Sequence, residues 1–244
     1  MTITGAADLL AAWEAGLAQE PAGRALLLHR AARPDLGDEP GTLLGLPVGA
    51  READLFALRR ALFGERMQVR LECGGCGQDM EFDLDAAQFA RTLAGPGEPL
   101  LGIAEDGWEV EFRLPAVADL AAAARAADPR RALLARCVVT AVRDGAPVPA
   151  DALPAAVQRR IAEAAEAADP GADVTLNVAC PECGDATRAE LDIASYLWTE
   201  LDAWARDVLL DVHLLATAYG WSEPEILALS PLRRRYYLEL CADV

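Results

Sequence analysis

Apolar side chains in the first 66 residues recur at spacings of three and four, the period of an amphipathic helix. This spacing predicts helices over residues 6–17, 21–32 and 50–63. Pro21 stands at the first position of the second helix, where its missing N–H is tolerated. Gly64 follows the third helix at the position where a glycine commonly ends one. We therefore expect an all-α N-terminal segment, residues 1–66.

The pattern then changes to period two around two cysteine-rich turns. The turns are CGGCG at residues 73–77 and CPECG at residues 180–184, and every second residue on both sides of each is apolar. Alternation of this kind predicts half-buried β-strands. Each C-x-x-C-G turn is therefore predicted to be the tip of a β-hairpin, over residues 67–84 and 173–193.

A cysteine pair two residues apart can present both thiolates to one tetrahedral metal ion. Two matched pairs with matched flanks indicate one shared structural Zn²⁺ site with four ligands: Cys73, Cys76, Cys180 and Cys183. Four thiolates leave no coordination position for water, so the site would be structural rather than catalytic. The ribbon would be discontinuous, because 103 residues lie between the two pairs, against roughly 15–20 in a free-standing zinc ribbon. The alternative is a redox-active or metal-free pair.

The segment between the hairpins is predicted to contain one strand and several alanine-rich helices. Trp108, Val110 and Phe112 alternate with acidic residues, which predicts a strand with one solvated face. Helices are expected over residues 117–127, 129–142 and 152–168. The apolar residues of the second helix indicate a buried face; they are Leu133, Leu134, Val138 and Val139. Residues 67–193 thus form the middle segment.

The C-terminal segment, residues 194–244, is strongly helical in pattern. One apolar stripe runs along a helix of about six turns; its members are Leu197, Leu201, Trp204, Val208, Val212, Leu215 and Tyr219. Ser222 and Glu225 form a predicted capping box. A last helix is expected from Pro231 to Leu240. The whole chain is therefore predicted to be α+β and mostly α-helical.

The amino-acid composition and charge argue against several classes of function. The chain has 244 residues, a net charge of −17 and no lysine. A phosphate-binding loop and a Schiff base both need a lysine, and the two histidines leave little for a catalytic triad. We expect that the protein is not an enzyme. Its acidity also opposes general nucleic-acid binding, which needs a basic surface.

No apolar run approaches the roughly 20 residues that span a bilayer, and the N-terminus lacks the basic region of a signal peptide. We therefore expect a cytoplasmic protein without membrane contact. Its thiols would be reduced and available for metal, since disulfides need an oxidising compartment.

The final helix carries Arg233, Arg234 and Arg235 ahead of Tyr236 and Tyr237. Two short helices after a glycine turn, the last one basic, are compatible with a DNA-binding helix-turn-helix. The other interpretation is a helical hairpin whose arginine and aromatic side chains anchor a protein partner. The charge of the whole chain favours the second interpretation.

Five C-terminal blocks resemble a known family: YLWTEL (196–201), DVHLLA (211–216), YGWSE (219–223), ILAL (226–229) and RRRYYL (233–238). Together with the order of helices and C-x-x-C hairpins, they resemble the T4-like baseplate hub assembly proteins. That family occurs in contractile phage tails and in phage-tail-like contractile injection systems. Trp13-Glu14 and the LFG at residues 62–64 are similar to members from injection systems.

The resemblance implies a non-enzymatic protein that is either an assembly chaperone for the hub or a constituent of the baseplate. Its expected partners are hub, spike, wedge or tail-tube proteins of the same particle. A partner surface is expected on the C-terminal helices, at Trp221, Arg233, Arg234, Arg235, Tyr236 and Tyr237. The alternative is a cytoplasmic zinc-ribbon adaptor or transcription-associated protein with a C-terminal helix-turn-helix.

Overall fold

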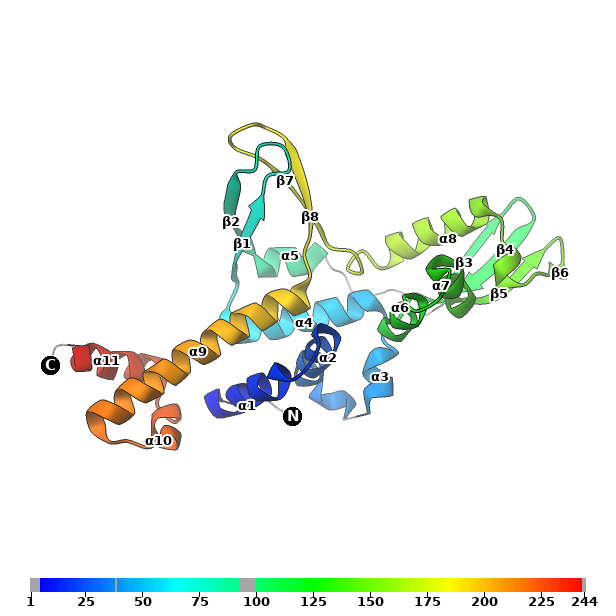
Figure 1. The fold of residues 1–244 in the computed structure, drawn as a ribbon. Helices are drawn as coiled ribbons and strands as arrows, with labels where there is room; N and C mark the ends of the chain where they lie inside the picture. The colour runs from blue at the N-terminus through cyan, green and yellow to red at the C-terminus, as the bar shows by residue number, and fades with distance from the viewer. Residues whose placement is uncertain (1–4, 38, 93–99, 243–244) are drawn as a thin grey trace. The chain divides into compact units, whose positions relative to one another are not determined.

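The structure is a computed structural model that describes residues 5–37, 39–92 and 100–242. The chain is built of helices and small antiparallel sheets, so the α+β prediction is confirmed. It divides into two compact units. Figure 1 labels the helices and strands of the chain. One unit contains the residues up to Asp35 and those from Ala194 onward, and the other runs from Leu36 to Ile193. The division into residues 1–66, 67–193 and 194–244 stays a prediction.

The first unit is helical. It contains α1 (Ala6–Leu17), α2 (Pro21–Ala32), α9 (Ile193–Tyr219, whose first residue belongs to the other unit), α10 (Glu223–Leu227) and α11 (Pro231–Ala242). In its core, Leu10 packs with Ala205 and Val208. The indole N–H of Trp13 donates to Asp202 Oδ1 at 2.8 Å, which ties α1 to α9. The predicted long helix and the last two helices are confirmed.

The predicted capping box is confirmed at the start of α10. The backbone N–H of Ser222 donates to Glu225 Oε2 at 2.8 Å, and the Ser222 hydroxyl donates to the same oxygen at 2.7 Å. This contact offsets one of the unpaired N–H groups that every helix start leaves. It fixes the turn that brings α10 and α11 back against the end of α9.

The second unit begins with η1 (Pro34–Leu36, which spans the boundary), α3 (Pro40–Leu44) and α4 (Val48–Phe63). Helix α4 begins two residues before the predicted start, because distant parts of the chain bind its free N–H groups. The Val48 N–H donates to the Pro115 carbonyl, and the Gly49 N–H donates to Asp169 Oδ2, both at 3.0 Å.

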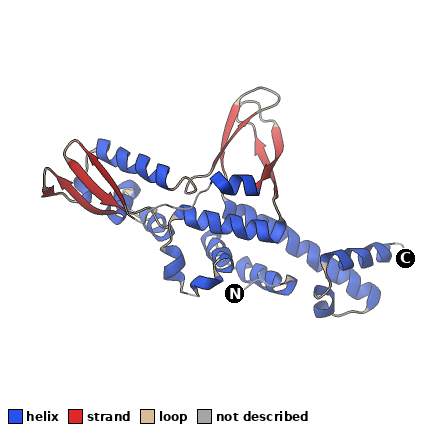
Figure 2. Ribbon diagram, turned by 180° about the vertical axis from the view of Figure 1, so that it is seen from behind, coloured by secondary structure: helices blue, strands red, loops and turns tan. Residues whose placement is uncertain are grey.

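Two hairpins follow the predicted pattern (Figure 2). Strands β1 (Arg66–Glu72) and β2 (Asp79–Asp85) pair antiparallel, and so do β7 (Thr175–Ala179) and β8 (Ala186–Glu190). Helix α5 (Ala86–Thr92) follows β2 directly. The two cysteine turns lie at the tips of these hairpins, as predicted from the alternation.

Between the hairpins lies a four-stranded antiparallel sheet with the order β3 (Leu101–Glu105), β4 (Trp108–Phe112), β5 (Val138–Arg143) and β6 (Ala146–Pro147). Helix α8 (Ala155–Ala168) packs on one face of it. The shared core contains Trp108, Val110, Phe112, Ala141, Leu153, Val157 and Ile161. The predicted alternation of buried and solvated residues along β4 is confirmed.

The helix predicted over residues 129–142 is wrong in its second half. Helix α7 (Pro129–Cys137) ends at Cys137, and the next residue begins β5. Pairing with β4 overrides the local helical preference: the Arg113 N–H donates to the Cys137 carbonyl at 2.9 Å. Val139, expected on a buried helical face, is 57% exposed. Helix α6 (Val117–Ala123) is shorter than the predicted 117–127, and α8 begins three residues later than predicted, after η2 (Ala150–Ala152).

Within the described ranges, no helix has the length and apolar character needed to cross a lipid bilayer.

Candidate metal centre

The two cysteine turns have the same backbone hydrogen bonds. In each, the N–H of the first cysteine donates to the carbonyl of the residue five positions later: Cys73 to Gln78 at 2.8 Å, and Cys180 to Asp185 at 2.9 Å. In each, the N–H of the glycine after the second cysteine donates back to the carbonyl of the first, at 2.9 Å. These bonds bend the chain so that both thiols of a pair lie on the same side of the turn.

Glycines are required at two kinds of position in these turns. Gly77 and Gly184 have φ angles of +73° and +80°, a region that residues with a Cβ rarely adopt. Glycine is required at position 75 because a Cβ there would overlap the carboxylate of Asp185 from the other turn. The Gly74 N–H also lies 3.4 Å from Thr187 Oγ1. The two hairpin tips therefore touch each other through backbone as well as sulfur.

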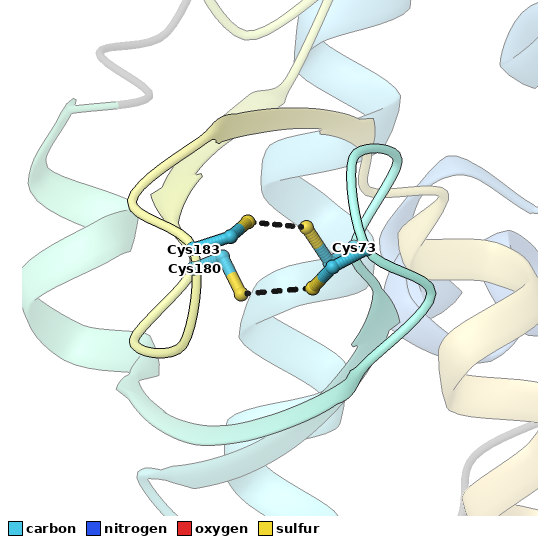
Figure 3. Close-up of side chains that lie close together, drawn as sticks. Cys73, Cys180 and Cys183 are labelled. Atoms are coloured by element: carbon cyan, nitrogen blue, oxygen red, sulfur yellow. Dashed lines mark hydrogen bonds between the residues drawn. The ribbon is translucent and has the colours of Figure 1, made fainter.

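The four thiols converge between the tips (Figure 3). The sulfur of Cys73 lies 3.6 Å from that of Cys183, and the sulfur of Cys76 lies 3.7 Å from that of Cys180. All four sulfurs lie within 4.8 Å of one another. A tetrahedral ion with metal–sulfur bonds of ~2.3 Å needs sulfur–sulfur separations of about 3.8 Å. The cluster thus has the dimensions of a four-thiolate metal site.

Burial differs between the members of each pair. Cys73 and Cys180 are each 2% exposed, whereas Cys76 and Cys183 are exposed. The two buried thiols pack with Met80, and Leu71 and Val178 lie against this group. One side of the cluster therefore packs on apolar side chains of both hairpins, an apolar floor, and its other side is exposed to solvent.

Backbone N–H groups favour a charged sulfur most strongly at Cys73. The N–H groups of Cys76 and Gly75 lower the pKa of the Cys73 thiol to about 6. The N–H of Asp185 also favours a thiolate at Cys183, but the other three sulfurs oppose it, and the pKa of Cys183 is about 12. Four neighbouring thiolates therefore repel one another, and a bound cation would remove that repulsion.

The residues predicted as metal ligands are thus brought together, across separations of 104 and 110 residues. All four are free thiols rather than disulfides. Four converging sulfur donors suit Zn²⁺ or an iron–sulfur centre, and they provide no oxygen ligand for Mg²⁺ or Ca²⁺. The donor set, the spacing and the apolar floor all fit a closed structural metal site.

The predicted partner-binding residues of the C-terminal helices are divided between two environments. Trp221 stacks on Tyr219 with ring centroids 4.6 Å apart, and Tyr237 meets Trp221 edge-on at 4.9 Å. Arg234 is 7% exposed and pairs with Asp211 at 3.1 Å. Arg233, Arg235 and Tyr236 are exposed. Their role in partner binding stays a prediction.

One contact that the sequence analysis missed fixes the base of the second hairpin. Asp169 ends α8 shortly before β7 and accepts from the start of α4, and its carboxylate fills the space that a side chain at residue 49 would need. No local pattern signals such a contact. The Asp-Gly pairs at residues 106–107 and 144–145 were a usable signal, because both form tight hairpin turns with positive φ.

The fold and the site define a class: an α+β protein in which two C-x-x-C hairpins, far apart in the sequence, share one four-thiol cluster. Residues 35–197 match the family model described as T4 bacteriophage base plate protein. The match covers about two thirds of the chain, so the chain belongs to this family. The predicted family is confirmed. No curated protein sequence and no solved structure matches the chain.

The family match includes α4, both hairpins and the sheet between them, and it ends near the start of α9. The four cysteines therefore lie inside the family-defining part of the chain. Most of α9, together with α10 and α11, lies beyond it.

Proposed function

We propose that this protein is a non-enzymatic assembly factor or structural component of the baseplate hub in a contractile phage tail or tail-like injection particle. Membership of the T4 base plate protein family carries the proposal. The protein acts through contacts with other baseplate proteins, and its expected partners are hub, spike, wedge or tail-tube proteins. Its place of action is the cytoplasm where particles assemble, or the finished particle itself.

A structural Zn²⁺ is part of this proposal. Cys73, Cys76, Cys180 and Cys183 would hold it, and their geometry supports a closed site. The ion would join the two hairpin tips and so close the whole inserted region between them into one loop. Its contribution would be to folding, because binding free energy at such a site is folding free energy.

A cavity of about 1320 Å³ lies between β4, α7, α8 and the second hairpin. Its described lining holds no histidine. The cysteine in it, Cys137, is buried, and burial raises the pKa of its thiol to about 11, so it stays protonated and unreactive at neutral pH. The cavity therefore offers no activated cysteine for a covalent mechanism.

The experiment that tests the proposal removes the gene from the cells that make the particle. We expect the yield of intact particles, counted by electron microscopy, to fall at least tenfold and to return when the gene is supplied in trans. An unchanged yield, together with absence of the protein from purified particles, would contradict the proposal. The zinc claim has its own readout: one mole of Zn²⁺ per mole of purified chain by mass spectrometry.

The DNA-binding alternative is less well supported. Of the three consecutive arginines, Arg234 is directed inward to Asp211 and does not contribute to an exposed basic surface. The chain's net charge of −17 opposes binding to phosphate.

A further inference from the structure

Helix α11 carries apolar side chains on two opposite faces. On the inner face, Tyr237 packs against Trp221, and Arg234 pairs with Asp211 on α9. On the outer face, a large apolar or aromatic side chain recurs at every fourth residue. These side chains, Leu232, Tyr236 and Leu240, are 66%, 61% and 58% exposed. We call these three residues the outer stripe. A surface helix normally buries one apolar face and leaves the other polar. The outer stripe is apolar but exposed, so we expect another protein to cover it.

Charge borders the outer stripe. Arg233 and Arg235 are both exposed on α11. Arg235 pairs with Glu239 at 3.0 Å, whereas Arg233 has no acidic partner within the described part of the chain. The exposed edge of α11 is therefore net positive in a protein whose overall charge is −17. Such an edge is complementary to acidic groups on a partner.

We infer that α11 docks by its outer stripe into an apolar groove with an acidic rim on another protein of the tail particle. This inference rests on the proposed baseplate function. Helix-in-groove recognition uses apolar anchors at spacings of three and four along one helix face. Leu232, Tyr236 and Leu240 supply these anchors. Arg233 and Arg235 pair with the acidic residues at the rim of the groove.

A second copy of this chain fits the outer stripe less well. Two parallel copies of α11 would bring Arg233 and Arg235 toward the same arginines of the partner copy, and like charges repel. Three side chains per copy also bury little area, since stable complexes bury about 1,200–2,000 Å² in total. A groove encloses a helix on its sides as well as its face and so removes more of α11 from water.

Site-specific photo-crosslinking identifies the occupant. The change Tyr236→benzoylphenylalanine is introduced in the cells that make the particle, with Thr217→benzoylphenylalanine on α9 as the control, because Thr217 is exposed but lies outside the stripe. We expect irradiation to link position 236, and not position 217, to another particle protein. The linked peptide should lie among apolar and acidic residues. An adduct of two copies of this chain, no adduct, or equal adducts at both positions would overturn the inference.

A complementation test separates this inference from the proposed function. Cells lacking the gene receive the wild-type chain, Tyr236→Glu, or Leu17→Glu as a matched control, since Leu17 is an exposed leucine on α1. We expect Tyr236→Glu to lower particle yield at least tenfold while keeping the wild-type melting temperature, and Leu17→Glu to stay within twofold. Full rescue by Tyr236→Glu would overturn only the docking inference. Normal particle yield without any gene, together with absence of the protein from purified particles, would contradict the proposed function.

Discussion

At the scale of single residues, buried charges join segments that are far apart in the sequence. Asp119 is almost fully buried and receives the guanidinium N–H groups of Arg113 and Arg136, at 2.9 and 2.8 Å, on its Oδ1. The Ala116 N–H donates to its Oδ2 at 2.9 Å. This one carboxylate therefore connects the end of β4, the start of α6 and the end of α7. The carboxylate of Asp169 likewise connects the end of α8 to the start of α4.

The Asp119 contacts predict a specific pH dependence. Arg113 above all holds the pKa of Asp119 down, to about 2 from 3.8. A lowered folded-state pKa gives stability that is present above pH 3.8 and is lost as pH falls toward 2. The contribution at neutral pH is at most about 2 kcal/mol. We expect the difference in unfolding free energy between wild type and Asp119→Asn, from urea titrations, to shrink between pH 5 and pH 2. A constant difference would contradict the assignment.

Gly49 makes a second prediction at this scale. A Cβ at this position would overlap the Asp169 carboxylate, so Gly49→Ala must move either α4 or α8. We expect a loss of roughly 1–3 kcal/mol by urea unfolding, typical of overpacking. Gly41→Ala is the control, because Gly41 has open space around it and lies in α3. Equal stability of the two variants would show that the Asp169 contact does not restrict residue 49.

At the scale of elements, neighbouring tyrosines on α11 have opposite environments. Tyr237 lies edge-on to Tyr219 and Trp221, with ring centroids 5.7 and 4.9 Å away, and so joins α11 to the end of α9. Tyr236 is on the outer face. Helix α11 thus packs Tyr237 against the rest of the protein, whereas Tyr236 is exposed to solvent.

This contrast predicts unequal effects of two matched substitutions. We expect Tyr237→Ala to cost roughly 1–3 kcal/mol through lost aromatic contacts. Tyr236→Ala should change stability by no more than about 0.5 kcal/mol, as is usual for exposed positions. Thermal unfolding monitored by circular dichroism measures both. Equal losses would mean that Tyr236 also packs within the chain.

Several elements could be predicted from the sequence because their signals are local. The hairpins around the cysteines follow from alternation and from C-x-x-C-G turns. The end of α4 follows from the glycine at position 64, whose φ in the structure is +83°. Strand β5 could not be recognised by the same means, because it continues an alanine-rich helix without a break. Only its pairing with β4 defines it, and that pairing is a tertiary contact. The Asp169 contact with α4 was hidden for the same reason, since it joins residues 120 apart.

At the scale of the whole molecule, the four-thiol cluster closes a long part of the chain. The stretch between the two cysteine pairs contains α5, the four-stranded sheet and the helices α6, α7 and α8, and its two ends meet at the hairpin tips. A bound metal would join those ends directly. Loss of the ion would free this stretch at one end.

Metal removal therefore has a large predicted effect. We expect a strong chelator to lower the melting temperature by about 10 °C or more, since each 1 kcal/mol is worth roughly 2–4 °C at this size. Cys73→Ser should reproduce the loss and abolish Zn²⁺ content, whereas Cys137→Ala should keep the metal because Cys137 lies outside the cluster. Calorimetry with metal analysis provides the measurement. An unchanged melting temperature in verified metal-free protein would contradict the zinc assignment.

The most direct test of the baseplate role is recovery of the tagged chain from the cells that make the particle, with mass spectrometry and a nucleic-acid assay on the eluate. We predict that spike, hub, wedge or tail-tube proteins are recovered with it. Comparison with intact particles then distinguishes a constituent from an assembly factor. Recovery of nucleic acid or RNA polymerase components, with no tail proteins, would contradict the account.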